Sequence, residues 1–274
     1  MNPADADRTM RDSQQLVVVA RQKLVLDAFR GTTSQTEQIR KKILDADVCG
    51  TQSTITDVHA ELRAQQGELL FDIVCRGHVT SRTTSRTDQV RIEGDGAHEF
   101  QLTKTVFFDG RTFRTSAPFG WIRARQIPQI VAGKLDTDPL IGQLANQVAW
   151  SEVIRRSPEV DRAVAEDLAA DVPEQVNARI DAELTYLADV WRQIRNSTEQ
   201  LPGGDSLQWN VSADDQVIRL SLTDGGRMAG GDSSPGITTL DAPPVGPVLN
   251  ADEEIAAVVS EEFLNNLLAE ALPE

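Results

Sequence analysis

The most regular hydrophobic pattern in the chain is an alternation with a period of two residues that begins near residue 53. The apolar positions are Val58, Ala60, Leu62, Leu69, Phe71, Ile73 and Cys75. Such alternation is typical of strands with one buried face, and the residues AQQG between the two runs predict a turn. We therefore predict antiparallel hairpins over 53–117. Two further turns are expected, one at Gly94-Asp95-Gly96 and a two-residue turn at Asp109-Gly110.

The alternation continues beyond Gly77 in polar residues. The segment SRTTSRT, residues 81–87, puts Ser81, Thr83 and Ser85 on one side of a strand and Arg82 and Arg86 on the other. Threonine suits a pleated surface, so this stretch can stay extended while both of its faces are wetted. It predicts a strand that runs past the core or lies at a sheet edge.

The N-terminal part predicts helices. The apolar spacing over 9–30, followed by Gly31, indicates a helix within an N-terminal segment 1–34. The shorter run over 35–46 predicts a second helix that ends before Gly50.

The middle of the chain, 139–198, predicts two or three helices. Asp138-Pro139 and Ser157-Pro158 suit helix starts, and Pro173 predicts a break or kink. A stripe with spacings of three and four residues is expected to face a core. It consists of Val176, Ile180, Leu184, Leu187, Trp191 and Ile194.

Strands are predicted again over 207–223, followed by a Gly/Pro-rich loop at 224–247. The acidic segment 250–274 predicts a strand and then a helix over 260–271. Its apolar face is formed by Phe263, Leu264, Leu267 and Leu268. A helix this short needs a surface to bury that face, either its own sheet or a partner, including a second copy of the chain.

These elements predict an α+β fold in which long antiparallel β-hairpins form a curved sheet that is packed by an inserted helical segment. We expect a single α+β domain over 35–249, in which strands 207–223 pair with the first sheet. The N-terminal segment 1–34 and the C-terminal segment 250–274 flank this domain.

Charge narrows the choice of partners. The formal net charge is −15, and residues 201–274 alone hold 13 Asp or Glu against Arg219 and Arg227. An acidic chain is a poor binder of phosphate backbones, so we expect no nucleic-acid partner. No stretch is long and apolar enough for a membrane span, and residues 1–20 lack the pattern of a signal peptide. The location is therefore unknown from these features, with the cytoplasm as the default when no signal is recognised.

Candidate chemistry is sparse. His59, His78 and His98 are predicted to be solvent-facing strand residues, and the hairpin register is expected to keep them apart. Cys49 and Cys75 are either two small buried residues or one disulfide. No pattern for a nucleophile, phosphate loop, metal or cofactor is present, so we expect no cofactor and nominate no catalytic residue.

A basic sheet face is the other candidate site. Arg82, Arg86, Arg111 and Arg114 belong to a strand region with more cations than acids. They can form a face for an anionic partner, or a solvated face that balances the acidic C-terminal part of the same chain.

Five segments of the chain, in this order, are similar to a known group of proteins. The segments are CRGHVTSRTTSRTDQVRIEGDGAHEFQLTKTVFFDG, PLIGQLANQVAW, VAEDLAADVPEQVNARIDAEL, LQWNVSADDQVIRLSL and FLNNLLA. Over roughly residues 50–270 the chain resembles large uncharacterised proteins of planctomycete bacteria. The resemblance implies a location in the cell envelope and no activity, cofactor or catalytic residue.

Two functions follow as hypotheses. The first is a non-enzymatic binding or structural module with a protein or lipid partner, and a lipid carrier would need an apolar groove between sheet and helices. The alternative is a hydrolase whose carboxylates are assembled by the fold and leave no local motif. A deep pocket with two inward carboxylates, or with a histidine beside an acid, would favour the enzyme.

Overall fold

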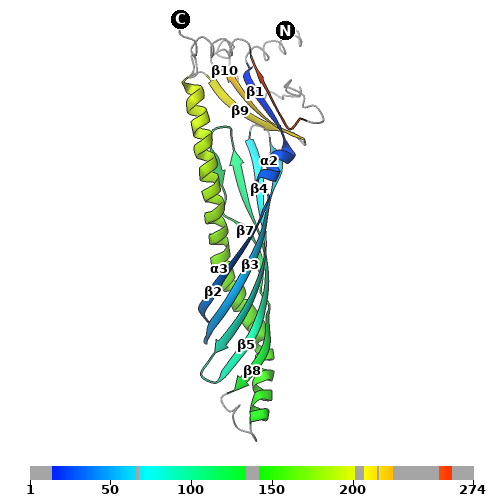
Figure 1. Cartoon of the computed structure of the whole chain (residues 1–274), viewed down its shortest axis with the longest axis vertical. Coiled ribbons are helices and arrows are strands. Elements are labelled where there is room, and N and C mark those ends of the chain that lie inside the picture. Colours follow the sequence, from blue (N-terminus) through cyan, green and yellow to red (C-terminus); the bar gives the residue numbers. More distant parts are fainter. Residues whose placement is uncertain are drawn as a thin grey trace, which may run out of the picture.

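A computed structural model shows an elongated molecule built from one long helix and two antiparallel sheets (Figure 1). It describes residues 14–65, 68–133, 142–200, 207–214, 216–224 and 253–260. The elements are β1 (Gln14–Arg21), α2 (Gln22–Ala28), β2 (Gly31–Ile43), β3 (Ala46–Gln65), β4 (Glu68–Arg86), β5 (Val90–Phe108), β6 (Phe113–Thr115), β7 (Phe119–Arg123), β8 (Gln126–Gly133), α3 (Gly142–Glu199), β9 (Leu207–Ala213), β10 (Val217–Asp224) and β11 (Ile255–Val259). The predicted α+β fold with a curved sheet and an inserted helix is confirmed.

The larger sheet has seven strands, in which β2, β3, β4 and β5 are sequential neighbours and β6, β7 and β8 all pair with β5. The β3–β4 pairing runs from Asp47 opposite Arg86 to Gln65 opposite Glu68. A strand of 20 residues is about 66 Å long at ~3.3 Å per residue. The sheet therefore follows most of the length of α3, which lies along it in Figure 1.

Two of the predicted turns are placed differently. Gly94 and Gly96 lie inside β5, and the β4–β5 turn is at 87–89, where the Thr87 hydroxyl accepts hydrogen bonds from the backbone N–H groups of Gln89 and Val90. The hairpin at Asp109 is confirmed, but its loop spans 109–112. Asp109 Oδ1 accepts from the N–H groups of Arg111 and Thr112, which favours this longer loop.

The helix predicted over 9–30 is wrong for most of its length, since β1 precedes the short helix α2. The residues Leu-Val-Val-Val favour a strand, and β1 lies between β10 and β11 with Val17 and Val19 buried. The helix predicted over 35–46 is also wrong. This stretch forms the edge strand β2 and the following turn, because pairing with β3 satisfies its backbone while its polar side chains stay in solvent.

The two or three predicted helices over 139–198 are one helix, α3, with Pro158 and Pro173 inside it. A proline removes one backbone hydrogen bond, but a helix can continue through it when the packing on both sides holds. Val164 and Leu168 are buried between the two prolines, and Ile180 and Leu184 are buried after the second. Of the predicted stripe, Ile194 stays exposed.

The β9–β10 hairpin is confirmed, but it joins β1 and β11 in a separate four-stranded sheet instead of pairing with the larger sheet. Its side chains still reach the main core. Val211 and Ile218 belong to the same buried cluster as Phe71, Phe108 and Leu184. The small sheet thus closes one end of the molecule, beside the C-terminal end of α3 (Figure 1).

Polar contacts join α3 to the larger sheet along its length. Lys104, 1% exposed, forms an ion pair with Asp181 at 2.7 Å and donates a hydrogen bond to Asn177. Lys41 of β2 pairs with Asp167 at 2.9 Å. Within the described residues, no helix is long and apolar enough to cross a membrane.

Candidate functional site

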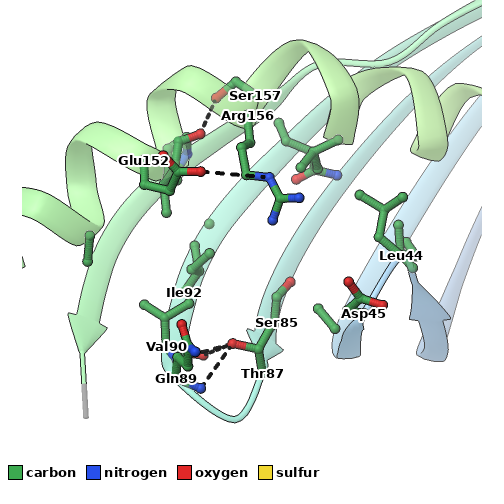
Figure 2. A pocket seen from close by; sticks show the side chains of 18 of the residues that line it. Leu44, Asp45, Ser85, Thr87, Gln89, Val90, Ile92, Glu152, Arg156 and Ser157 are labelled. Atoms are coloured by element: carbon green, nitrogen blue, oxygen red, sulfur yellow. Dashed lines mark hydrogen bonds and ion pairs between the residues drawn. The ribbon is translucent and has the colours of Figure 1, made fainter.

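A cavity of about 730 Å³ lies between the larger sheet and the first part of α3, at the end of the molecule opposite the small sheet. Figure 2 shows the helix on one side and the strands on the other. The apolar walls are formed by Ile43, Leu44, Ala46, Val48, Val90, Ile92, Pro128, Ala145, Val148, Ala149, Val153, Val160 and Val164. The volume falls within the ~300–1,000 Å³ that is usual for small-molecule sites.

The cavity exists because the inner face of the sheet changes from large to small side chains along its strands. In the core, β4 and β5 contribute Phe71, Ile73 and Phe108. Toward the cavity, the inner positions of β4 are Ser81 and Thr83, which are buried, and then Ser85. The register places glycines opposite two of them, with Gly96 across from Ser81 and Gly94 across from Thr83.

The Thr/Ser/Arg run therefore has two faces with different surroundings. Arg82 and Arg86 point outward and are exposed, while Thr83 and Ser85 line the cavity beneath α3. The expectation that both faces of this strand are wetted is wrong for Ser81 and Thr83, because α3 extends over them. The short side chains leave a volume that leucine or phenylalanine would fill.

Polar groups gather on the sides of the cavity. Arg156 extends from α3 into the space between helix and strands (Figure 2). Its Nε lies 3.3 Å from Glu159 Oε2 and 3.9 Å from Glu152 Oε1. Ser85 lies on the opposite wall. The Arg155 guanidinium holds the pKa of the Glu152 carboxyl below its usual range through a hydrogen bond.

The part of α3 over the cavity is attached to the sheet at its two ends. The backbone N–H of Gly133 donates to Asn146 Oδ1 at 3.0 Å, and that of Gln126 donates to Asp161 Oδ1 at 2.7 Å. Every side-chain hydrogen bond and ion pair that the structure describes for residues 147–160 stays within the helix. Leu44 and Val148 line the cavity and are 49% and 70% exposed, so it opens to solvent there.

His98 lies next to Gln126, which lines the cavity, and contradicts the prediction of a solvent-facing histidine because it is 3% exposed. Its Nδ1 accepts a hydrogen bond from the backbone N–H of Arg125 at 3.2 Å. Burial lowers the pKa of the His98 imidazole, with nearby Asp161 opposing and His78 adding to the shift. The register places His98 opposite Val79 and His78 opposite Glu99, on opposite faces of the sheet, so the prediction that no two histidines face each other is confirmed.

We expect stability to fall as the pH drops below the unfolded-state histidine pKa of ~6.5, because the folded state resists the proton that the unfolded chain accepts. Above that pH the His98 contribution is fully present. Between pH 7.5 and 5.5, the free energy of unfolding measured by chemical denaturation should fall more steeply for the wild type than for His98→Asn. The amide oxygen of asparagine can replace the Nδ1 acceptor. Equal slopes would contradict a buried, neutral His98.

The four arginines predicted as a basic face are not brought together. Arg82 lies opposite Asp95 and Arg114 opposite Phe107, twelve residues further along β5 or about 40 Å at ~3.3 Å per residue. Arg82 is paired with Asp95 at 3.2 Å, and Arg114 forms an ion pair with Glu68. The backbone oxygen of Arg111 accepts a hydrogen bond from Arg195. The predicted contact residues Phe263, Leu264, Leu267 and Leu268 lie outside the described residues.

Both cysteines are free, which contradicts the disulfide alternative, and the prediction of two buried cysteines holds for Cys75 but is wrong for Cys49, which is exposed. Burial raises the pKa of the Cys75 thiol to about 11. A smaller cavity of about 230 Å³ lies in the core between the two sheets and α3, with Phe29, Phe71 and Trp191 among its walls. Among the described residues, no cluster of His, Cys, Asp and Glu can hold a metal ion.

The carboxylates do not form the pair that a hydrolase would need in the large cavity. Asp45, after β2, and Glu152 of α3 lie on opposite sides of it (Figure 2). In the comparisons with known proteins, no family model and no curated protein matches the chain. The planctomycete resemblance thus stays a prediction.

Proposed function

We propose that this protein is a non-enzymatic module that binds a lipid-like, largely apolar molecule in the cavity beneath α3. The observation that carries the proposal is a cavity of about 730 Å³ whose walls are aliphatic on both the helix side and the sheet side. Transferring apolar ligand surface from water into such a site is favourable by about 25 cal/mol per Å².

The C-terminal residues 261–274 begin too far from the cavity to fill it. β11 pairs antiparallel with β1 so that Val259 lies opposite Leu16, in the small sheet at the other end of the molecule. Residues 261–274 span at most about 50 Å when fully extended. The part of α3 between residue 199, near the small sheet, and Val164, at the near end of the cavity, is about 52 Å long at ~1.5 Å per residue. The rest of the cavity is farther from the small sheet than Val164.

The alternatives have less support. A hydrolase would need converging carboxylates or a histidine beside an acid in the cavity, whereas Asp45 and Glu152 are separated and His98 lies beyond Gln126. The protein-partner version depended on Phe263 and its neighbours, outside the described residues. A location in the cell envelope stays a proposal from the resemblance alone.

The test uses N-phenyl-1-naphthylamine, an uncharged dye whose fluorescence rises in apolar surroundings. The wild-type protein, stripped of bound lipid, should show a saturable increase with one site per chain. Ala145 and Ala149 both line the cavity one helical turn apart. The variant Ala145→Trp/Ala149→Trp should bind at least about tenfold more weakly, because two indole groups occupy the site.

A matched control is available on the same helix. Ala169→Trp/Ala170→Trp adds the same two side chains at exposed positions away from the cavity. It should keep wild-type dye affinity. If the wild type shows no saturable signal, or if both double variants bind as the wild type does, the proposed function is wrong.

A further inference from the structure

We propose that the occupant is a single-chain amphiphile with an anionic head, such as a fatty acid, whose carboxylate is bound by Arg156 while its chain lies under α3. This inference rests on the proposed function and names the ligand class. Three observations support it, namely the size of the cavity, the hydrogen-bonding state of Arg156 and the position of Ser85.

The volume of the cavity is sufficient for one acyl chain. At about 30 Å³ per non-hydrogen atom, roughly the share of one water molecule in the liquid, the cavity holds about 24 such atoms. A fatty acid of 16 to 18 carbons has about 18 to 20 of them and fits.

Arg156 offers donors to an anion. Its guanidinium has five N–H donors. Its described interactions are two ion pairs, both through Nε, and neither has the geometry of a hydrogen bond. The group extends into the space between α3 and the strands, as Figure 2 shows. A ligand carboxylate can therefore accept two parallel hydrogen bonds from the terminal nitrogens, the geometry that arginine provides best.

The opposite wall completes a polar end for the ligand. Ser85 lines the cavity across from Arg156, and its hydroxyl can donate to the same carboxylate. Thr87 is less available, because its hydroxyl donates to the backbone oxygen of Val90 at 3.4 Å. Glu152 is held by Arg155, with two hydrogen bonds of 2.9 and 2.5 Å. It therefore competes less for Arg156.

The experiment is displacement of N-phenyl-1-naphthylamine from the wild type by three ligands of equal chain length: dodecanoate, dodecanol and dodecylammonium. Dodecanoate should displace the dye at about 10- to 100-fold lower concentration than dodecanol, the range expected for hydrogen bonds to a charged group. Binding of the dye alone shows whether the cavity accepts apolar molecules. A failure of the proposed function can therefore be distinguished from a failure of the head-group inference.

Two variants assign the head-group site. Arg156→Leu should keep dye binding and lose the preference for dodecanoate over dodecanol. Arg162→Leu removes a cation from an exposed position of the same helix that does not line the cavity, and it should keep the preference. Equal displacement by the three ligands, a preference for dodecylammonium, or a preference that survives Arg156→Leu would overturn the inference while dye binding still supported the proposed function.

Discussion

Replacing Phe108 with alanine is expected to lower the free energy of unfolding by about 3–5 kcal/mol. Phe108 is 5% exposed and packs on Phe113, with ring centroids 4.4 Å apart, and edge-on against Trp191 at 5.3 Å. Trp191 in turn contacts Trp209 of the small sheet at 5.1 Å. The substitution removes the ring that joins the larger sheet to this aromatic chain, and urea denaturation measures the loss.

Phe107 provides the control because it is the same residue type at the preceding position of β5. It points to the opposite face of the sheet, where the Arg114 guanidinium lies 5.6 Å from its ring. Phe107→Ala should cost about 1 kcal/mol or less, mainly from the loss of this cation–π contact with an exposed arginine. Similar losses for the two variants would show that the aromatic chain does not hold the sheets and α3 together.

The second large effect is expected at the ion pair that joins α3 to the larger sheet. Asp181→Ala should destabilise the protein by about 3 kcal/mol, the lower end of the range for breaking a buried pair, because Lys104 is left in the core with an uncompensated charge. The Asp181 side chain is 41% exposed, which moderates the cost. Thermal or urea denaturation at neutral pH provides the measurement.

The reciprocal variant should behave differently. Lys104→Met replaces the buried cation by an apolar chain of similar length, and Asp181 keeps a hydrogen bond of 2.9 Å from Asn177. We expect this change to cost clearly less than Asp181→Ala, and the second substitution to cost little once Lys104 is gone. Asp189→Ala, which breaks the exposed pair with Arg192 on the same helix, should have almost no effect. Additive losses in the double variant would contradict direct coupling of Lys104 and Asp181.

The parts of the fold that could be predicted from the sequence are those in which neighbouring residues decide the structure. Leu69, Phe71, Ile73 and Cys75 alternate locally, and all four are buried on the predicted face of β4. The strand β1 could not be predicted in this way, since its partners β10 and β11 are far away in the sequence. The continuity of α3 through Pro158 and Pro173 likewise depends on packing along the sheet.

An apolar groove between sheet and helices was one of the hypotheses, but its position was not predicted, although a signal for it is present in the sequence. Ser81, Thr83 and Ser85 alternate with exposed residues, and Gly94 and Gly96 have the same spacing on the next strand. Small residues at every second position of two paired strands indicate a cavity, or a closely packed element, above that face of the sheet. The sequence alone did not show that α3 extends this far, because the prolines predicted that the helix would end.

The pairing of β1 with β10 has a consequence for how the chain is made. Val18 lies opposite Leu220, so about 200 residues must be synthesised after β1 before its partner exists. At roughly 5–20 residues per second this takes about 10–40 seconds on the ribosome. During that time the larger sheet can form from adjacent hairpins, whereas the uncharged, β-branched residues of β1 stay unpaired and can associate with other nascent chains. We therefore expect the yield of folded protein to rise when a chaperone shields β1 until translation has passed β10.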